Sequence, residues 1–170
     1  MPVPHLSTTE FAVLGVLAEG PSHGFAISKE FEPDAELGRV FKVRRPLVYR
    51  ALERLVEAGY AEAISTEKGD AGPNRVIHRI TRSGRRHLDS WLAEPVSHVR
   101  DLRIEFLLKL ALVRRSGRSP LALVEKQREA LDTTFSALDE VDIDDHVELW
   151  RRHNAAAAAA YLEDLSKRYS

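Results

Sequence analysis

The chain contains 170 residues, of which 44% are hydrophobic and 30% charged, and its formal net charge is −1. This composition is ordinary for a globular protein, and the length allows one domain with or without a dimerising extension. The absence of cysteine excludes a disulfide scaffold, a thiolate zinc site and a cysteine nucleophile. The first residues lack the pattern of a secretory signal, and no apolar run approaches the roughly 20 residues that cross a bilayer, so we expect a cytoplasmic protein.

The charges are distributed unevenly along the chain. Residues 39–86 contain twelve Lys and Arg and five Asp and Glu, a net charge of +7, so the remainder of the chain is acidic. A local basic stripe on a nearly neutral protein is typical of a nucleic-acid site, although a solvated basic surface has the same composition.

The amino-terminal third predicts two helices and a connector. The capping-box pattern of residues 7–10 starts a helix over residues 7–19, and the Gly-Pro pair that follows ends it. A second helix is expected from Ser22 or His23 to Pro33. Residues 33–43 have no predicted regular structure.

The segment after this connector predicts a third helix with an apolar back and an arginine-rich front. Pro46 suits its first position and Gly59 its end. The apolar positions recur at helical spacing and are expected to be buried: Val48, Ala51, Leu52, Leu55 and Val56. The residues off this stripe are Tyr49, Arg50, Glu53, Arg54 and Glu57.

A hairpin and a fourth helix follow. Residues 60–66 and 75–81 read as two strands, because turn-forming residues fill the interval between them. Thr81 is expected to cap a helix that extends through Leu92. Its inward-facing residues are Leu88, Trp91 and Leu92. The pair Glu94-Pro95 marks the end of this first module.

The second half predicts helices over residues 100–114, from Ser119 to about Leu138, and from about Asp144 onward. Two long amphipathic helices at the end of a chain need each other or a second subunit to bury their apolar stripes. An intrachain hairpin satisfies this need, but we favour a homodimer. The expected dimer contacts are Leu131, Phe135, Leu138, Trp150, Ala158, Tyr161 and Leu165.

Three motifs in this order resemble the PadR family of transcriptional regulators. Residues 6–27, which contain a Gly-Pro-Ser-His-Gly-Phe turn, resemble the family's opening helix and turn. Residues 48–55 resemble its recognition helix, and residues 72–85 resemble the second wing strand and the entry to the next helix. The resemblance covers residues 6–92, and the carboxyl-terminal half is more loosely similar to members with a long dimerisation domain.

The chain departs from the family in two places. Where the family often has Gly-Ser-Leu-Tyr-Pro, this chain has Arg-Pro-Leu-Val-Tyr-Arg at residues 45–50, so the recognition of bases is expected to differ. The usual Gly-Arg-Pro of the wing corresponds to residues 71–74, Ala-Gly-Pro-Asn, which changes the expected contacts at the tip.

A helix followed by a basic hairpin predicts a winged helix-turn-helix in which the third helix enters the major groove of DNA. Arginine can form two hydrogen bonds with guanine, whereas tyrosine and lysine more often contact phosphates. The candidate contacts are Lys42, Arg44, Arg45, Tyr49, Arg50 and Arg54 near this helix, and Lys68, Asn74 and Arg75 in the wing. A solvated helix face and an ordinary charged hairpin are the alternatives.

Two further groups have two interpretations each. Ser22 and His23 stand at the start of the second helix, where backbone N–H groups can bind a phosphate, but His23 can instead stabilise the turn. Trp91 and Trp150 are core or interface residues in one interpretation and line an effector pocket in the other. The resemblance implies an effector of the class of phenolic acids, drugs or other small aromatic compounds.

Enzymatic motifs are absent from the sequence. It contains no GxSxG, HExxH, P-loop or GxGxxG pattern, and His146 and His153 lie without a cluster of carboxylates that would complete a metal site. We therefore expect neither enzyme activity nor a cofactor or metal.

These observations predict a mostly α protein with a small β-hairpin wing. A winged helix-turn-helix DNA-binding domain is expected over residues 1–94 and a helical dimerisation and effector domain over residues 95–170. The predicted function is sequence-specific transcriptional regulation, as a dimeric repressor that a small-molecule effector releases from its operator. The alternative is a winged-helix protein-interaction module that binds an acidic partner.

Overall fold

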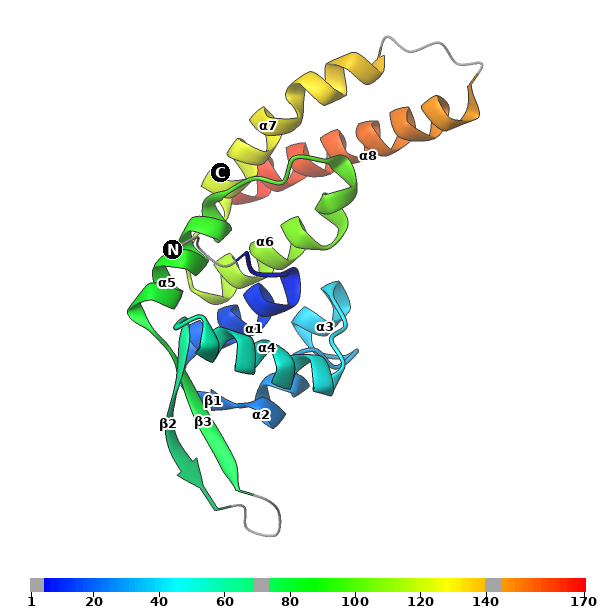
Figure 1. The fold of residues 1–170 in the computed structure, drawn as a ribbon. Helices are drawn as coiled ribbons and strands as arrows, with labels where there is room; N and C mark the ends of the chain where they lie inside the picture. The colour runs from blue at the N-terminus through cyan, green and yellow to red at the C-terminus, as the bar shows by residue number, and fades with distance from the viewer. Residues whose placement is uncertain (1–4, 69–73, 140–144) are drawn as a thin grey trace. The chain divides into compact units, whose positions relative to one another are not determined.

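The computed structural model describes residues 5–68, 74–139 and 145–170. The chain divides into two compact units, Met1–Trp91 and Leu92–Ser170. Most described residues are helical, and a small antiparallel sheet lies in the first unit, as the sequence predicts (Figure 1). The expected domains 1–94 and 95–170 remain a prediction.

Helix α1, Thr8–Glu19, begins at the predicted capping box. The Ser7 amide donates to the Glu10 carboxylate at 2.7 Å, and the Glu10 amide donates to the Ser7 hydroxyl at 3.4 Å. Residues 10–17 are all buried, and α1 packs against α4. The start, the end and the core role of this helix are therefore confirmed.

The region after α1 differs from the prediction. Ser22–His23 form a short strand, β1, and helix α2 covers Gly24–Lys29. The His23 Nδ1 atom accepts a hydrogen bond from the Ala26 amide at 3.2 Å and so caps α2. The predicted helix begins at its His23 cap but ends at Lys29 and not at Pro33, and the connector contains a further short helix, α3, Glu36–Val40.

Helix α4, Arg45–Glu57, has the predicted amphipathic form. Four of the five predicted stripe residues are buried: Val48, Ala51, Leu52 and Leu55. The prediction for Val56 was wrong, since this residue is 39% exposed at the margin of the stripe. Gly59 follows the helix with φ of 73°, a left-handed conformation that favours glycine and allows the chain to turn into the sheet.

The sheet contains β1, β2, Ala61–Glu67, and β3, Arg75–Ile80, in the order β1-β3-β2, and all pairs are antiparallel. The two long strands are the predicted hairpin. Strand β2 forms one edge of the sheet, and its register shifts between Ala63 and Ser65, which leaves Ile64 as an extra residue. On the other side of β3, Ser22 pairs with His78 and His23 with Ile77.

Helix α5, Arg82–Ala93, starts at the predicted Thr81 cap. The Thr81 hydroxyl accepts from the Gly84 amide at 3.0 Å and donates to the Gly59 carbonyl at 2.7 Å, which ties α5 to the end of α4. The predicted inward residues Leu88, Trp91 and Leu92 are buried.

An aromatic column forms part of the core of the first unit. Trp91 stacks on Phe11 at 4.3 Å between ring centroids, Phe11 faces His87 at 5.4 Å, and His87 stacks on Tyr60 at 4.7 Å. Trp91 is therefore a core residue, and its predicted place in an effector pocket is corrected: one ring face lies against Phe11, and the side chain is buried.

The second unit contains a 3₁₀-helix, η1, Val99–Arg103, and three α-helices: α6, Glu105–Arg115, α7, Leu121–Asp139, and α8, His146–Tyr169. The helix predicted over residues 100–114 is thus divided between η1 and α6. Helices α7 and α8 lie side by side (Figure 1). Among the described residues, no helix combines the length and apolar character needed to cross a bilayer.

Two buried polar side chains fix the start of this unit. The Gln127 side chain on α7 accepts from the Val96 amide at 2.8 Å and donates to the Val96 carbonyl at 2.9 Å. Lys109 on α6 donates to the Glu94 carbonyl at 2.8 Å and pairs with Glu105 at 2.9 Å. These contacts hold the segment after α5 against α6 and α7.

The seven expected dimer contacts differ in how exposed their side chains are. Leu131 and Leu165 are buried within the chain, which leaves them unavailable to a second subunit and corrects this part of the prediction. Phe135 and Ala158 are half-buried, and Trp150 and Tyr161 are exposed, Trp150 to 69%. The side chain of Leu138 lies outside the described residues.

Candidate nucleic-acid interface

The face of α4 opposite its buried stripe is exposed and carries three arginines and two glutamates. Arg44, which precedes the helix, and Arg45 and Arg50, which lie on it, are exposed, and Tyr49 is 44% exposed. Lys42 is also exposed, in the segment that leads into the helix. The helix therefore presents the combination of guanidinium, phenol and ammonium groups that contacts bases and phosphates in DNA complexes.

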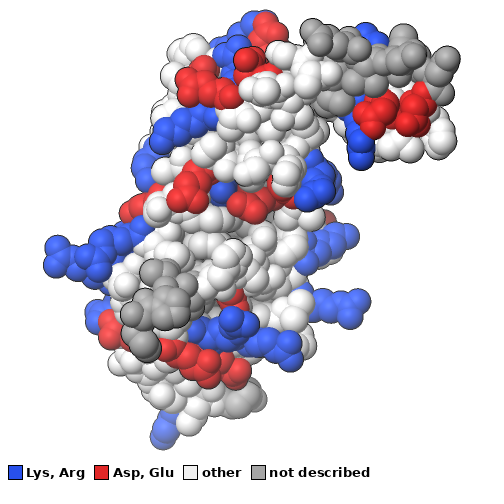
Figure 2. Space-filling view, turned by 45° about the horizontal axis from the view of Figure 1, so that its top comes forward, with Lys and Arg blue, Asp and Glu red and all other residues white. Residues whose placement is uncertain are grey.

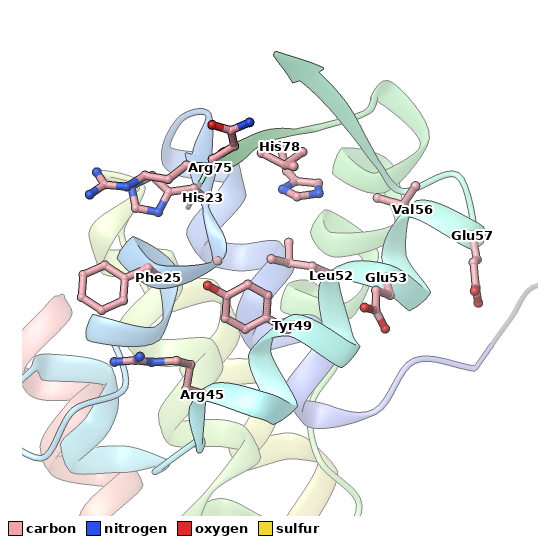
Figure 3. A pocket seen from close by; sticks show the side chains of 13 residues that line it. His23, Phe25, Arg45, Tyr49, Leu52, Glu53, Val56, Glu57, Arg75 and His78 are labelled. Atoms are coloured by element: carbon pink, nitrogen blue, oxygen red, sulfur yellow. The ribbon is translucent and has the colours of Figure 1, made fainter. Parts of the chain in front are cut away.

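A cavity of about 700 Å³ lies between α2, α4 and β3. His23 and Phe25 line it from the start of α2, Arg45 and Tyr49 from α4, and Arg75 and His78 from β3. Figure 3 shows the rings of Phe25 and Tyr49 facing this hollow with Arg45 beside them and His78 across it. Four of these six residues are predicted DNA contacts, so the structure brings α4 and the wing together around one cavity.

Three close contacts involve residues at or next to this cavity. The Arg45 guanidinium lies 4.8 Å from the centroid of the Phe25 ring, and the Lys29 ammonium lies 5.0 Å from it. The Tyr49 ring lies so close to Gly24 that a methyl group at that residue would be 2.7 Å from the Tyr49 Cε1 atom. Sequence reasoning missed Gly24 and Phe25 as parts of this site, because their contacts with α4 are not encoded in any local pattern.

Arg54 has a different role from its neighbours on α4. Its Nε atom lies 2.9 Å from a carboxylate oxygen of Glu10, whose side chain is only 5% exposed. Glu10 also accepts the Ser7 amide at the start of α1. The ion pair thus joins α4 to α1 and gives Arg54 a role in the fold, while its predicted contact with DNA stays a prediction.

Ser22 and His23, the expected phosphate site at the start of the second helix, are engaged in contacts within the fold. Ser22 and His23 are half-buried in β1, where they pair with β3. The Nδ1 atom of His23 is used to cap α2. The structure therefore favours the interpretation in which His23 stabilises the turn, and α2, which covers only Gly24–Lys29, begins one residue later than the predicted phosphate site.

The wing presents basic and polar groups at the two described ends of its tip. Lys68 follows β2, Asn74 precedes β3, and Arg75 is the first residue of β3; all three are exposed. Farther along the wing, the Arg79 guanidinium pairs with Glu62 across the two strands at 2.8 Å. The three predicted wing residues are therefore open to a ligand, while Arg79 is engaged within the sheet.

The electrostatic character of the cavity is mixed. Glu53 and Glu57 line it on α4 together with the basic groups. Burial lowers the pKa of His78, and a hydrogen bond with the Val76 backbone opposes this effect. The face drawn in Figure 2 likewise shows Lys and Arg side chains interspersed with Asp and Glu, in keeping with a net charge of −1. The predicted DNA contacts of the helix and the wing therefore lie among acidic groups.

Among residues 5–68, 74–139 and 145–170, no three metal-ligating side chains come together. His146 and His153 both lie exposed on α8.

The model of the transcriptional regulator PadR-like family matches residues 13–90. Residues 13–90 are therefore similar to this family. This range contains the described parts of α2, α4 and the wing, so the PadR-like segment coincides with the elements that surround the cavity. A relative from Mycobacterium tuberculosis, named "Probable transcriptional regulator Rv1176c", is 29% identical over 100 residues, which are 59% of this chain and 48% of the relative. The matched stretch thus spans about half the length of that relative.

The chain is also similar to several solved structures. Bacillus subtilis PadR in complex with operator DNA is 20% identical, with a TM-score of 0.49 over 92% of this chain and 97% of that one. The protein smu.1604c from Streptococcus mutans is 17% identical, with a TM-score of 0.46 over 94% of this chain and 96% of that one. Bacillus subtilis PadR has also been solved with p-coumaric acid, with 18% identity, a TM-score of 0.42 and coverage of 95% of both chains.

Proposed function

We propose that the protein is a sequence-specific DNA-binding transcriptional regulator of the winged helix-turn-helix type. The observation that carries this proposal is the exposed face of α4, where Arg45 and Tyr49 line one cavity with Asn74 and Arg75 of the wing, and Arg50 is exposed on the same helix. In a complex, α4 enters the major groove and the wing follows the neighbouring backbone or minor groove. The PadR-like match over residues 13–90 supports the same function.

The proposed contacts fall into two classes. Arg45, Tyr49 and Arg50 lie on α4 and read base edges or fix the helix in the groove, since arginine can form two hydrogen bonds with guanine. The remaining contacts neutralise phosphates and position the protein: Lys42, Arg44, Lys68, Asn74 and Arg75.

The second unit supports a proposal of dimerisation. Trp150 and Tyr161 are exposed apolar side chains on α8, and Phe135 is half-buried on the neighbouring α7. A second subunit that covers them would bury large aromatic surfaces and place two copies of α4 at two half-sites of an operator. We propose a homodimer on this basis, with Ala158 as a small residue that permits close approach of the helices.

An effector site is proposed beside Trp150. A cavity of about 880 Å³ in the second unit is lined by Trp150 together with arginine and threonine side chains, among them Arg100, Arg103 and Thr133. An indole ring with guanidinium groups suits a small aromatic compound with an acidic group. We propose that effector binding favours a dimer geometry with the wrong spacing of half-sites and so releases the operator, and that the DNA-bound protein acts as a repressor.

Fluorescence anisotropy tests the DNA-binding proposal. A duplex from the region upstream of the protein's own coding sequence is compared with a scrambled duplex at two salt concentrations. We expect preferential binding that weakens with salt, because phosphate contacts release counterions. Arg50→Ala is expected to lower the affinity, whereas Arg168→Ala, which removes the same charge from an exposed site on α8, is expected to leave it unchanged. Equal binding to both duplexes would contradict the proposal and favour an interaction module for an acidic partner.

A further inference from the structure

Gly24 makes room for the Tyr49 ring. It is buried in the first turn of α2, and a Cβ atom at this residue would lie 2.7 Å from Cε1 and 2.9 Å from Cζ of Tyr49. Heavy atoms of a real side chain do not approach so closely, so any larger residue at this site moves the ring. The atoms that would clash are the far end of a side chain that is 44% exposed. The ring can therefore swing outward without disturbing the core.

Phe25 holds Arg45 by a different contact. The guanidinium carbon lies 4.8 Å from the centre of the Phe25 ring, within the range of an attractive cation–π contact. Lys29 approaches the same ring at 5.0 Å. Figure 3 shows Arg45 extended along the hollow beside the Phe25 ring. This contact restricts a long side chain that would otherwise sample many rotamers on an exposed helix.

The turn that carries Gly24 and Phe25 is itself fixed. His23 caps α2 through the Ala26 amide and pairs with Ile77 of β3 in the sheet. The first turn of α2 is therefore attached to the wing on one side and contacts α4 on the other. Both contacts with α4 residues come from consecutive residues of this turn, Gly24 with Tyr49 and Phe25 with Arg45.

We propose that Gly24 and Phe25 are positioning residues that set the rotamers of Tyr49 and Arg45 and so determine which operator sequence the protein prefers. The inference rests on the proposed DNA-binding function. A side chain that is fixed before binding loses less conformational entropy in the complex and tolerates fewer alternative bases. Operator preference then depends on α2 residues that act through α4, in addition to the residues on α4 itself.

The first experiment substitutes Gly24 and compares it with a neighbouring glycine. The probe is a duplex that the wild-type protein selects from a random-sequence pool, and the reference is its scrambled version. Gly24→Ala is expected to lower the ratio of the two affinities about tenfold while the affinity for scrambled DNA and its salt dependence stay unchanged. Gly20→Ala is the matched control, because a Cβ atom at Gly20 meets nothing within 4 Å; it is expected to retain the wild-type ratio.

A double-mutant cycle separates positioning from a direct contact. Tyr49→Ala is expected to lower the ratio by a similar factor, and Gly24→Ala is expected to add nothing in that background. An unchanged ratio in Gly24→Ala would overturn the role of this glycine. An undiminished effect of Gly24→Ala in the Tyr49→Ala background would do the same, because it would show an action that does not pass through Tyr49.

Phe25 provides a second arm that does not depend on the folding of the Gly24 variant. Phe25→Leu is expected to reduce the ratio of the affinities for selected and scrambled DNA severalfold. Phe25→Tyr, which keeps the aromatic face, is expected to retain the wild-type ratio. Neither substitution should change the ratio in an Arg45→Ala background. Equal ratios in Phe25→Leu and the wild type would overturn this arm. If the wild-type protein enriches no sequence from the pool, the proposed function fails, and the positioning role falls with it before any variant is measured.

Discussion

Arg50 and Arg54 lie one turn apart on α4, yet the structure predicts opposite consequences for their removal. Arg54 pairs with Glu10 at 2.9 Å, and the Glu10 side chain is 5% exposed while that of Arg54 is 56% exposed. Arg50 lies on the exposed face that we propose for DNA. We expect Arg54→Met to lower the stability of the fold with little effect on DNA affinity, and Arg50→Met to lower DNA affinity with little effect on stability.

The magnitude follows from the unequal exposure of the two partners. An exposed ion pair contributes about 0.2–1 kcal/mol, and the loss of one partner of a fully buried pair costs about 3–5 kcal/mol. Arg54 is half solvated and Glu10 keeps the Ser7 amide as a donor, so the cost of Arg54→Met lies toward the lower value, at about 1–2 kcal/mol. For Arg50→Met we expect a change in stability below about 0.5 kcal/mol and a loss of affinity of about tenfold.

Urea unfolding followed by circular dichroism and anisotropy with the selected duplex measure the two quantities on the same samples. A cost of 1–2 kcal/mol shifts the unfolding midpoint by roughly 0.5–1 M. Glu10→Gln is expected to reproduce the shift of Arg54→Met, and the combination of both substitutions is expected to cost less than their sum. The assignment of Arg54 to the fold is refuted if Arg54→Met is as stable as the wild type and binds the duplex as weakly as Arg50→Met.

Three further predictions concern stability. Gln127→Leu removes both hydrogen bonds to the buried Val96 backbone and is expected to lower the free energy of unfolding by about 2–4 kcal/mol; an equally stable variant in urea would show that water replaces the side chain. Burial lowers the pKa of His78 in the folded protein. As the pH falls below about 6.5, His78 is therefore protonated in the unfolded chain before it is protonated in the folded one. The free energy of unfolding is highest above this pH and decreases as the pH falls through the folded-state pKa. His78→Gln should flatten this part of the pH profile of unfolding, and an unchanged slope would assign it to other groups. Gly84→Ala places a Cβ atom 2.1 Å from the Tyr60 carbonyl oxygen and is expected to lower the free energy of unfolding by about 1–3 kcal/mol. Thermal unfolding measures this change, and a melting temperature equal to that of the wild type would contradict it.

The sequence predicted the elements whose signals are local. The capping box of α1, the apolar stripe of α4 and the Thr81 cap of α5 each depend on residues within one or two turns, and all three are present. The hairpin was recognised because turn residues separate two runs of strand formers. Boundaries of these elements differ from the prediction by a residue or two.

The sequence did not predict the elements that depend on distant partners. Strand β1 is only Ser22–His23, and it exists because β3 provides hydrogen-bonding partners more than fifty residues later. Helix α3 is too short for a periodic signal. Val56 has the apolar character of its neighbours on α4, but it lies at the margin of the stripe, where no element covers it fully.

The site was predicted at the level of elements and less well at the level of side chains. The basic helix and the wing were identified from charge and spacing. The pair of Arg54 with Glu10 and the contact of Tyr49 with Gly24 join residues that are far apart in sequence, so neither could be read from a local pattern. Trp91 and Trp150 have the same chemistry but opposite surroundings, one stacked in the core and the other 69% exposed.

The irregular pairing of β2 also affects whether strands of two molecules can pair with each other. As an edge strand, β2 presents unpaired backbone groups that a strand from a neighbouring molecule could join, and Ile64 adds an exposed apolar side chain there. The extra residue at Ile64 bends this edge and interrupts the regular spacing of its donors and acceptors. A neighbouring wing therefore finds a poor template for continuous pairing, and the hairpin can stay open to solvent without promoting aggregation.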